Sequence, residues 1–148
     1  MAFTNYRIDQ KAHNLVQNHY QKGVNNQVFK MRTTVAFGLE RFWGEQWRFS
    51  PEKEKEKDKH EYWKAVWQQL VDTMAEVGIT SLPNEEVRTI KGGQLDTVQI
   101  RAIADQIWAM DQNERKIVQA ILLQLCDSLI WWTQRYKKLA PNGDNDDE

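Results

Sequence analysis

Apolar residues recur every three or four positions along most of the chain, which is the spacing of one face of an α-helix. The first such stretch runs from Ile8 to about Tyr20. A second restarts at Val28, after Gly23 and two asparagines, and reaches about Trp47. These stretches predict two helices separated by a glycine-containing turn.

A third helix is predicted to start near Glu52. Ser50 is a good N-cap, and Pro51 suits the first helical position because the amide it lacks would have no partner there. The next residues, EKEKEKDK, place like charges four apart as well as opposite charges three apart, so we expect fraying in the first turns. Beyond them an apolar stripe runs from Trp63 to Val77, and Gly78 predicts the end of the helix.

Residues 79–94 lack periodicity and predict a long connection with a helical turn near Glu85. Asp96 is a candidate cap for a fourth helix, whose apolar residues are Val98, Ile103, Ile107 and Met110. Asp111 and Glu114 resemble a capping box for a fifth helix that runs to about Leu139. Without any alternating strand pattern or internal repeat, the sequence predicts an all-α fold, a single helical bundle of about five helices.

Composition is consistent with one small intracellular domain. The chain has 148 residues, with only 3 Pro and 7 Gly, too few for the many turns of a β-sandwich. It has no secretory signal, no apolar run of about 18 residues, and one cysteine, which cannot form an internal disulfide. We expect a cytoplasmic protein with a helical-bundle domain over residues 1–140 and a disordered acidic tail over 141–148.

Charge is distributed unevenly. Four acidic residues lie within the last five positions, and without them 20 basic residues face 17 acidic ones. Residues 1–48 contain seven Lys and Arg against three acids, and residues 115–138 contain five against one. Such regions permit a polyanionic partner without requiring one.

Few residues suggest chemistry. His13 and His19 are six apart, so on one helix they point in different directions and cannot share a metal ion. Cys126 lies in the middle of the fifth helix and is expected to be a buried apolar residue. Gly92-Gly93 lacks the strand and the Lys-Ser/Thr of a phosphate loop. We expect no enzymatic activity, no cofactor and no metal site.

The second helix presents a basic face with an aromatic residue at its centre, opposite its apolar stripe. This face consists of Lys30, Thr34, Phe37, Arg41 and Arg48. Lys and Arg neutralise phosphates, and an exposed ring stacks on a base, so the combination suits nucleic acid. The alternative is a solvated face whose Phe37 packs on the long connection.

The fifth helix carries apolar residues on two sides, which is typical of a central helix or of one half-covered by a partner. The second arc consists of Leu123, Ile130 and Trp131, and the first consists of Val118, Ile121, Leu122, Leu125, Leu129, Trp132 and Tyr136. At its end, Arg135, Lys137 and Lys138 are further candidates for nucleic-acid binding, or cations that stabilise the C-terminal carbonyls. We expect protein contacts at the second arc and at Trp43 and Trp47, which lie at the edges of apolar stripes.

Two segments carry a family resemblance. Cys126-Asp-Ser-Leu-Ile-Trp-Trp-Thr-Gln-Arg-Tyr-Lys137 and Tyr6-Arg-Ile-Asp-Gln-Lys-Ala-His-Asn-Leu-Val16 resemble the C-terminal helical region of the large subunit of type I-D CRISPR effector complexes. In that family the region is also made separately as the small subunit. The resemblance covers most of the chain and involves helical sequence without a chemical motif.

The resemblance implies a non-catalytic small subunit of an RNA-guided surveillance complex. Its implied partners are the backbone and large subunits, further copies of itself, crRNA and target DNA, with no membrane and no small-molecule substrate. The basic face would then bind and stabilise nucleic acid. The alternative from another class is a helical adaptor that contacts only protein, its basic residues serving solubility.

Overall fold

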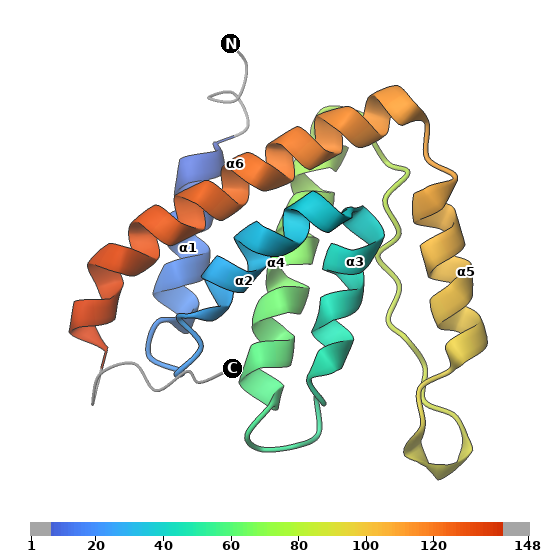
Figure 1. Ribbon diagram of the computed structural model, residues 1–148, viewed down its shortest axis with the longest axis horizontal. Coiled ribbons are helices and arrows are strands. Elements are labelled where there is room, and N and C mark those ends of the chain that lie inside the picture. Colours follow the sequence, from blue (N-terminus) through green and yellow to red (C-terminus); the bar gives the residue numbers. More distant parts are fainter. Residues whose placement is uncertain (1–6, 141–148) are drawn as a thin grey trace.

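The computed structural model describes residues 7–140, which form six α-helices and several 3₁₀ turns around one hydrophobic core (Figure 1). The α-helices are α1 (Ile8–His19), α2 (Gln27–Thr34), α3 (Leu39–Gly44), α4 (Lys57–Ala75), α5 (Thr97–Trp108) and α6 (Gln112–Tyr136). The prediction of an all-α fold is confirmed, with six helices rather than about five, because the predicted second helix is two helices. The tail predicted at 141–148 lies outside the described residues.

Helix α6 is the longest element, and it packs on α1, α2 and α4 (Figure 1). Its predicted first arc is buried from Val118 to Leu129, and Trp132 and Tyr136 continue it half-buried against the core. Helix α2 runs antiparallel to it: Asn26 bonds Lys137 at one end, and Val35 accepts a bond from Gln119 at the other. The stripe of α6 is thus the common packing surface of the helices.

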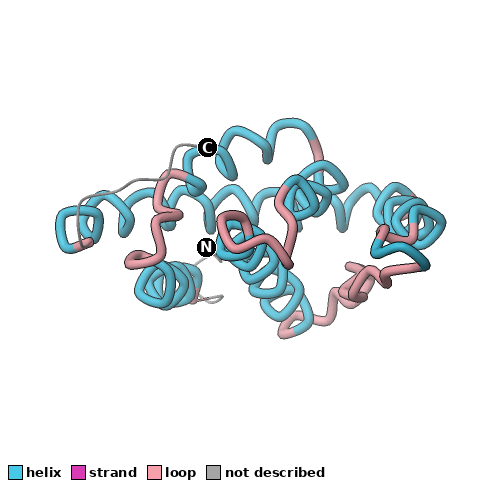
Figure 2. The backbone as a smooth tube through the Cα atoms, turned by 90° about the horizontal axis from the view of Figure 1, so that it is seen from below, coloured by secondary structure: helices cyan, strands magenta, loops and turns pink. Residues whose placement is uncertain are grey.

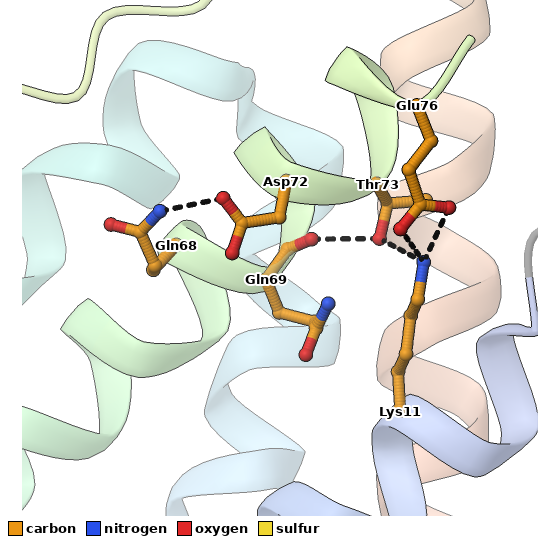
Figure 3. Close-up of polar contacts among 6 residues, drawn as sticks. All are labelled: Lys11, Gln68, Gln69, Asp72, Thr73 and Glu76. Atoms are coloured by element: carbon orange, nitrogen blue, oxygen red, sulfur yellow. Dashed lines mark hydrogen bonds and ion pairs between the residues drawn. The ribbon is translucent and has the colours of Figure 1, made fainter.

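Polar contacts tie α1 to the end of α4. The Lys11 ammonium donates to the Thr73 hydroxyl at 3.0 Å and forms an ion pair with Glu76 at 3.1 Å (Figure 3). The Thr73 hydroxyl in turn donates to the Gln69 carbonyl at 2.7 Å. The Lys11 side chain is 13% exposed and the Glu76 side chain 55%, so the part-buried bond to Thr73 is the more sheltered of the two contacts.

Helix α4 begins at Lys57, five residues later than predicted. Ser50 does not cap a helix: its hydroxyl accepts from the Glu52 amide at 3.1 Å, and its own amide donates to the Glu56 carboxylate at 2.7 Å. These bonds close a turn over residues 50–56, where the alternating charges give little helical support. Fraying was expected in these first turns, but the structure goes further, since none of residues 51–56 is helical.

The three predicted helix-end signals at Gly78, Asp96 and Asp111 are confirmed. Gly78 has φ 86, and the bonds from its amide to Ala75 and from Ile79 to Met74 form a Schellman motif. Asp96 and Asp111 each accept two amide bonds at the start of the following helix. The Glu114 carboxylate accepts from the Ser81 hydroxyl instead of closing a capping box.

The long connection between α4 and α5 has no helical turn near Glu85; its one 3₁₀ turn is Lys91–Gly93. Side chains hold its backbone in place, because Trp67 donates to the Pro83 carbonyl and Gln99 bonds both Glu86 and Arg88. Figure 2 shows the described backbone as helices joined by loops, without strands. None of the described helices has the length and apolar content needed to cross a membrane.

The packed face of α5 differs from the predicted one at a single residue. Ile103, Ile107 and Met110 are buried, but Val98 is 78% exposed. Five residues separate Val98 from Ile103, which turns the two side chains about 140° apart on a helix. Gln99, four residues before Ile103, takes the inward position instead.

The burial of α6 predicts the effect of trimming one of its leucines. Leu125→Ala should lower the free energy of unfolding by about 2–5 kcal/mol, since it removes methylenes from a 2% exposed side chain and leaves a cavity. Leu139→Ala is the matched control, because Leu139 is 64% exposed and the chemical change is identical. Urea unfolding followed by circular dichroism measures both, and equal losses would contradict the packing described.

Candidate nucleic-acid interface

The residues of the predicted basic face lie on consecutive short helices. Lys30 and Thr34 are on α2, Phe37 is on the 3₁₀ turn Val35–Phe37, Arg41 is on α3, and Arg48 is on the 3₁₀ turn Glu45–Arg48. Their spacing of three, four or seven residues keeps them on one side of each helical segment. The opposite side, which includes Val28, Met31, Leu39 and Phe42, is buried.

The prediction of one helix from Val28 to about Trp47 is wrong, because the chain breaks at Gly38. Gly38 has φ 114 and ψ 158, a conformation that side chains with a Cβ rarely adopt. A Cβ at this position would lie 2.5 Å from Oε2 of Glu40. That carboxylate accepts from Arg115 of α6 at 3.4 Å, so the break is linked to the core helix. Gly44, by contrast, is helical with φ -70.

The break leaves an open groove on the surface, with a volume of about 470 Å³. All five residues of the predicted basic face line it, and the structure adds three: Phe29, Thr33 and Glu45. We call this surface the basic groove. Phe29 and Thr33 are four residues apart and form a row on α2 next to Lys30 and Thr34. The prediction from sequence missed this row because it took only the side of the helix directly opposite the apolar stripe.

Phe37 is exposed in the basic groove. Its side chain is 59% accessible, so the alternative in which it packs on the connection does not apply. The Arg41 guanidinium lies 5.8 Å from the centroid of the ring, within the range of a cation–π contact. Phe37 thus offers an aromatic surface next to a cation.

The groove is positively charged, with three cations and one carboxylate among its lining residues. The carboxylate, Glu45, pairs with Arg48 through two contacts of 2.9 and 3.2 Å. This pair orients the Arg48 guanidinium, which remains 59% exposed. Lys30 and Arg41 supply the remaining positive charge.

The two threonines of the groove use their hydroxyl protons within α2. Thr33 donates to the Phe29 carbonyl at 3.1 Å, and Thr34 donates to the Lys30 carbonyl at 2.7 Å. Their hydroxyl protons are therefore not available to a ligand. Hydrogen-bond donors for a phosphate come from the ammonium and guanidinium groups instead.

The three C-terminal cations do not form one cluster. Lys137 borders the groove: its ammonium lies 5.7 Å from the centroid of the Phe29 ring and donates to Asn26 at 2.9 Å. Arg135 lies away from the groove, 3.8 Å from the centroid of the Trp131 ring. It donates to the Trp131 carbonyl, as expected of a cation that stabilises the C-terminal end of α6. Lys138 is exposed and does not line the groove.

The expected protein-contact residues are also divided. Trp43 is only 4% exposed and belongs to the core, a correction that follows from its packing between α3 and α4. Trp47, Leu123 and Ile130 are half-buried against the core. Trp131 is 48% exposed and lies beside the carboxylates of Asp9 and Asp127, which line the same shallow pocket. Of this set, Trp131 alone presents a large free surface.

The described residues offer little for catalysis. Burial raises the pKa of the Cys126 thiol, which disfavours the thiolate. His13 stacks on Trp132, whereas His19 bonds the Leu15 carbonyl and stacks on Tyr62, so the two histidines face different surroundings. Within residues 7–140, no three His, Cys, Asp or Glu side chains gather as metal ligands.

Comparison of the chain with models of protein families, with curated proteins and with solved structures finds no match. The function therefore has to be inferred from the residues and their geometry.

The break at Gly38 predicts opposite effects for two similar substitutions. Gly38→Ala should lower the free energy of unfolding by about 1–3 kcal/mol, because alanine strains the backbone and meets Glu40. Gly44→Ala should leave it unchanged or raise it by about 0.5–1 kcal/mol, since Gly44 is helical and has open space at its Cα. Chemical denaturation of both variants tests this, and a tolerated Gly38→Ala would contradict the break.

Proposed function

We propose that this chain is a non-catalytic subunit that binds single-stranded nucleic acid in the basic groove. The observation that carries the proposal is that all five residues predicted from sequence as a binding face line one groove, although a helix break separates them. Cations surround an exposed ring there, as in proteins that hold phosphates and stack bases.

The exposed ring favours a single strand over a duplex. Stacking on Phe37 requires a base with a free face, and the bases of a duplex are stacked on each other. Three cations line the same groove as the ring, and the Arg41 guanidinium lies 5.8 Å from its centroid, so a strand whose base stacks on Phe37 has cations near its backbone. Sequence preference should be weak, since neither cations nor a ring reads base edges.

The resemblance to the small subunit of type I-D CRISPR effector complexes supplies the proposed setting. In it, the chain works in the cytoplasm, packs along the backbone and large subunits and further copies of itself, and holds crRNA or target DNA. The all-α fold and the basic groove are compatible with this setting. The half-buried Leu123 and Ile130 and the exposed Trp131 are the proposed contacts with protein subunits.

The salt dependence of oligonucleotide binding distinguishes this proposal from the alternative of a protein-binding adaptor. Binding through phosphates weakens steeply as salt rises, with a log-log slope of about -0.7 per phosphate neutralised on a single strand. An adaptor that contacts only protein would show no such binding. Titration of a fluorescent oligothymidine at several salt concentrations, read by anisotropy, distinguishes the two.

Neutralising two groove cations tests the site itself. Lys30→Gln with Arg41→Gln should weaken oligothymidine binding about tenfold at low salt and reduce the magnitude of the salt slope by about 1.4, as two phosphate contacts are lost. Circular dichroism of the variant checks that the fold is retained, since neither side chain belongs to the hydrophobic core.

Lys22→Gln with Lys91→Gln is the matched control, since it removes the same charge from two exposed positions outside the groove. The control should bind within about twofold of the unmodified chain. Equal losses in the two double variants would mean that only net charge matters, and the groove would then not be the site.

The ring makes a separate prediction. Phe37→Leu keeps an apolar side chain but removes the aromatic face, so binding to oligothymidine should weaken by about 1–3 kcal/mol while the salt slope stays unchanged. Binding to a duplex of equal length should not change. A parallel loss on both ligands would contradict base stacking at Phe37.

A further inference from the structure

Helix α5 presents large apolar side chains on the side that faces away from the core. Val98 is 78% exposed and Trp108 is 50% exposed, whereas Ile103 and Ile107 on the opposite side are buried. The helix packs against α3 and lies at the edge of the molecule (Figure 1). Two exposed apolar residues alone do not define a docking surface, since single ones are common.

A charged pair lies between these two residues on the same side of the helix. The Nε atom of Arg101 lies 2.9 Å from Oδ1 of Asp105, and the two side chains are 73% and 54% exposed. The Arg101 guanidinium also lies 5.7 Å from the centroid of the Trp108 ring. Steps of three, four and three residues connect Val98, Arg101, Asp105 and Trp108, which is the spacing of a helix face that pairs with another helix. We call these four residues the α5 stripe.

The α5 stripe is complementary to itself when its direction is reversed. Its steps of three, four and three residues are the same from either end, and its order is apolar, positive, negative, apolar. An antiparallel second copy therefore places the partner's Trp108 opposite Val98 and the partner's Asp105 opposite Arg101. A twofold axis repeats both contacts, so the two apolar contacts flank two ion pairs.

We propose that two copies of this chain associate through α5, which pairs with the same helix of the second copy in antiparallel orientation about a twofold axis. The partner of the α5 stripe is thus a second copy of the chain. The proposal does not rest on the proposed function, because none of the four residues lines the basic groove.

The size of the helix predicts a weak association. Helix α5 has 12 residues and is therefore about 18 Å long, so a pair of such helices buries less than the roughly 1,600 Å² of a standard interface. The Trp108 indole supplies the largest apolar surface, and the ion pairs select the antiparallel orientation. We expect the dimer to form only at high protein concentration.

Reversal of each charge tests the pairing. Arg101→Asp places carboxylates opposite each other at two symmetric positions, and Asp105→Arg does the same with guanidinium groups. Each variant should weaken self-association about tenfold or more, because like charges then meet in the interface. Sedimentation velocity at low salt, over a concentration series that reaches the millimolar range, measures this without nucleic acid.

The two variants should rescue each other. In an equimolar mixture, the acidic stripe of Arg101→Asp faces the basic stripe of Asp105→Arg, so association should return to about the level of the unmodified chain. The double variant Arg101→Asp/Asp105→Arg should also associate at that level, since it restores both ion pairs with the charges exchanged. Trp108→Ala should weaken association about tenfold by removing the largest apolar contact.

Lys57→Asp is the matched control for Arg101→Asp. It changes the net charge equally at an exposed lysine of α4 that is also paired within its own chain, with Glu54 at 3.1 Å. Its self-association should stay within about twofold of that of the unmodified chain. Circular dichroism of all variants checks that the helices are retained.

Three outcomes would overturn the proposal. The unmodified chain could remain monomeric up to millimolar concentration, or Arg101→Asp could associate as tightly as the unmodified chain or only as weakly as Lys57→Asp. The mixture of the two charge variants could also associate no more tightly than either variant alone. The proposed function is measured separately, by oligothymidine binding, and stands or falls independently of all three.

Discussion

The buried stripe of α6 is the surface on which the rest of the chain assembles. Its residues from Val118 to Leu129 are fully enclosed, and α1, α2 and α4 all contact it. Burial of that many branched side chains supplies most of the free energy that orders the short helices, since α2 and α3 are below the length at which isolated helices are stable in water. Helix α2 packs on α6, whereas α3 packs on α4 and α5 and is joined to α6 by the contact between Glu40 and Arg115. The basic groove depends on the packing of both short helices.

The helix break at Gly38 gives this packing a concave surface. In one straight helix the five residues of the basic face would form a narrow ridge about 27 Å long. The break turns α3 away from the direction of α2, and the contact between Glu40 and Arg115 ties the corner to α6. A concave surface with an exposed ring at the corner replaces the ridge.

The sequence predicts those features that depend on local chemistry. Caps at Asp96 and Asp111 and the glycine end of α4 follow from short-range hydrogen bonds, and the first arc of α6 follows from its periodicity. The break at Gly38 was missed because a single glycine within an apolar period is tolerated in helices, and its conformation depends on Glu40 and on α6, which are tertiary contacts. The late start of α4 was missed for a related reason, since the Ser50 amide bonds Glu56 six residues away.

Trp43 was predicted to contact protein because its position was read on one straight helix, but it is buried in the core. If one helix continued from Val28, Trp43 would lie at the edge of the apolar stripe. Because the chain turns at Gly38, the buried side of α3 no longer continues that stripe. Trp43 then points into the core beside Phe42. The residues of the basic face still lie on one surface after this turn, since Phe37 before the break and Arg41 after it line the same groove.

Two aromatic surfaces lie towards opposite ends of α6, because Val35, two residues before Phe37, bonds Gln119 near the start of the helix, whereas Trp131 lies near its end. The charged residues around the two rings differ. Phe37 lies among cations, so its surface attracts phosphates and carboxylates. Trp131 is covered on one side by Arg135 and shares a shallow pocket with Asp9 and Asp127, and the Asp127 carboxylate pairs with Arg32 at 2.7 Å. Positive and negative charges therefore largely balance around this ring. The excess of positive charge around Phe37 and the near balance of charge around Trp131 therefore distinguish the two surfaces, although both present an exposed ring.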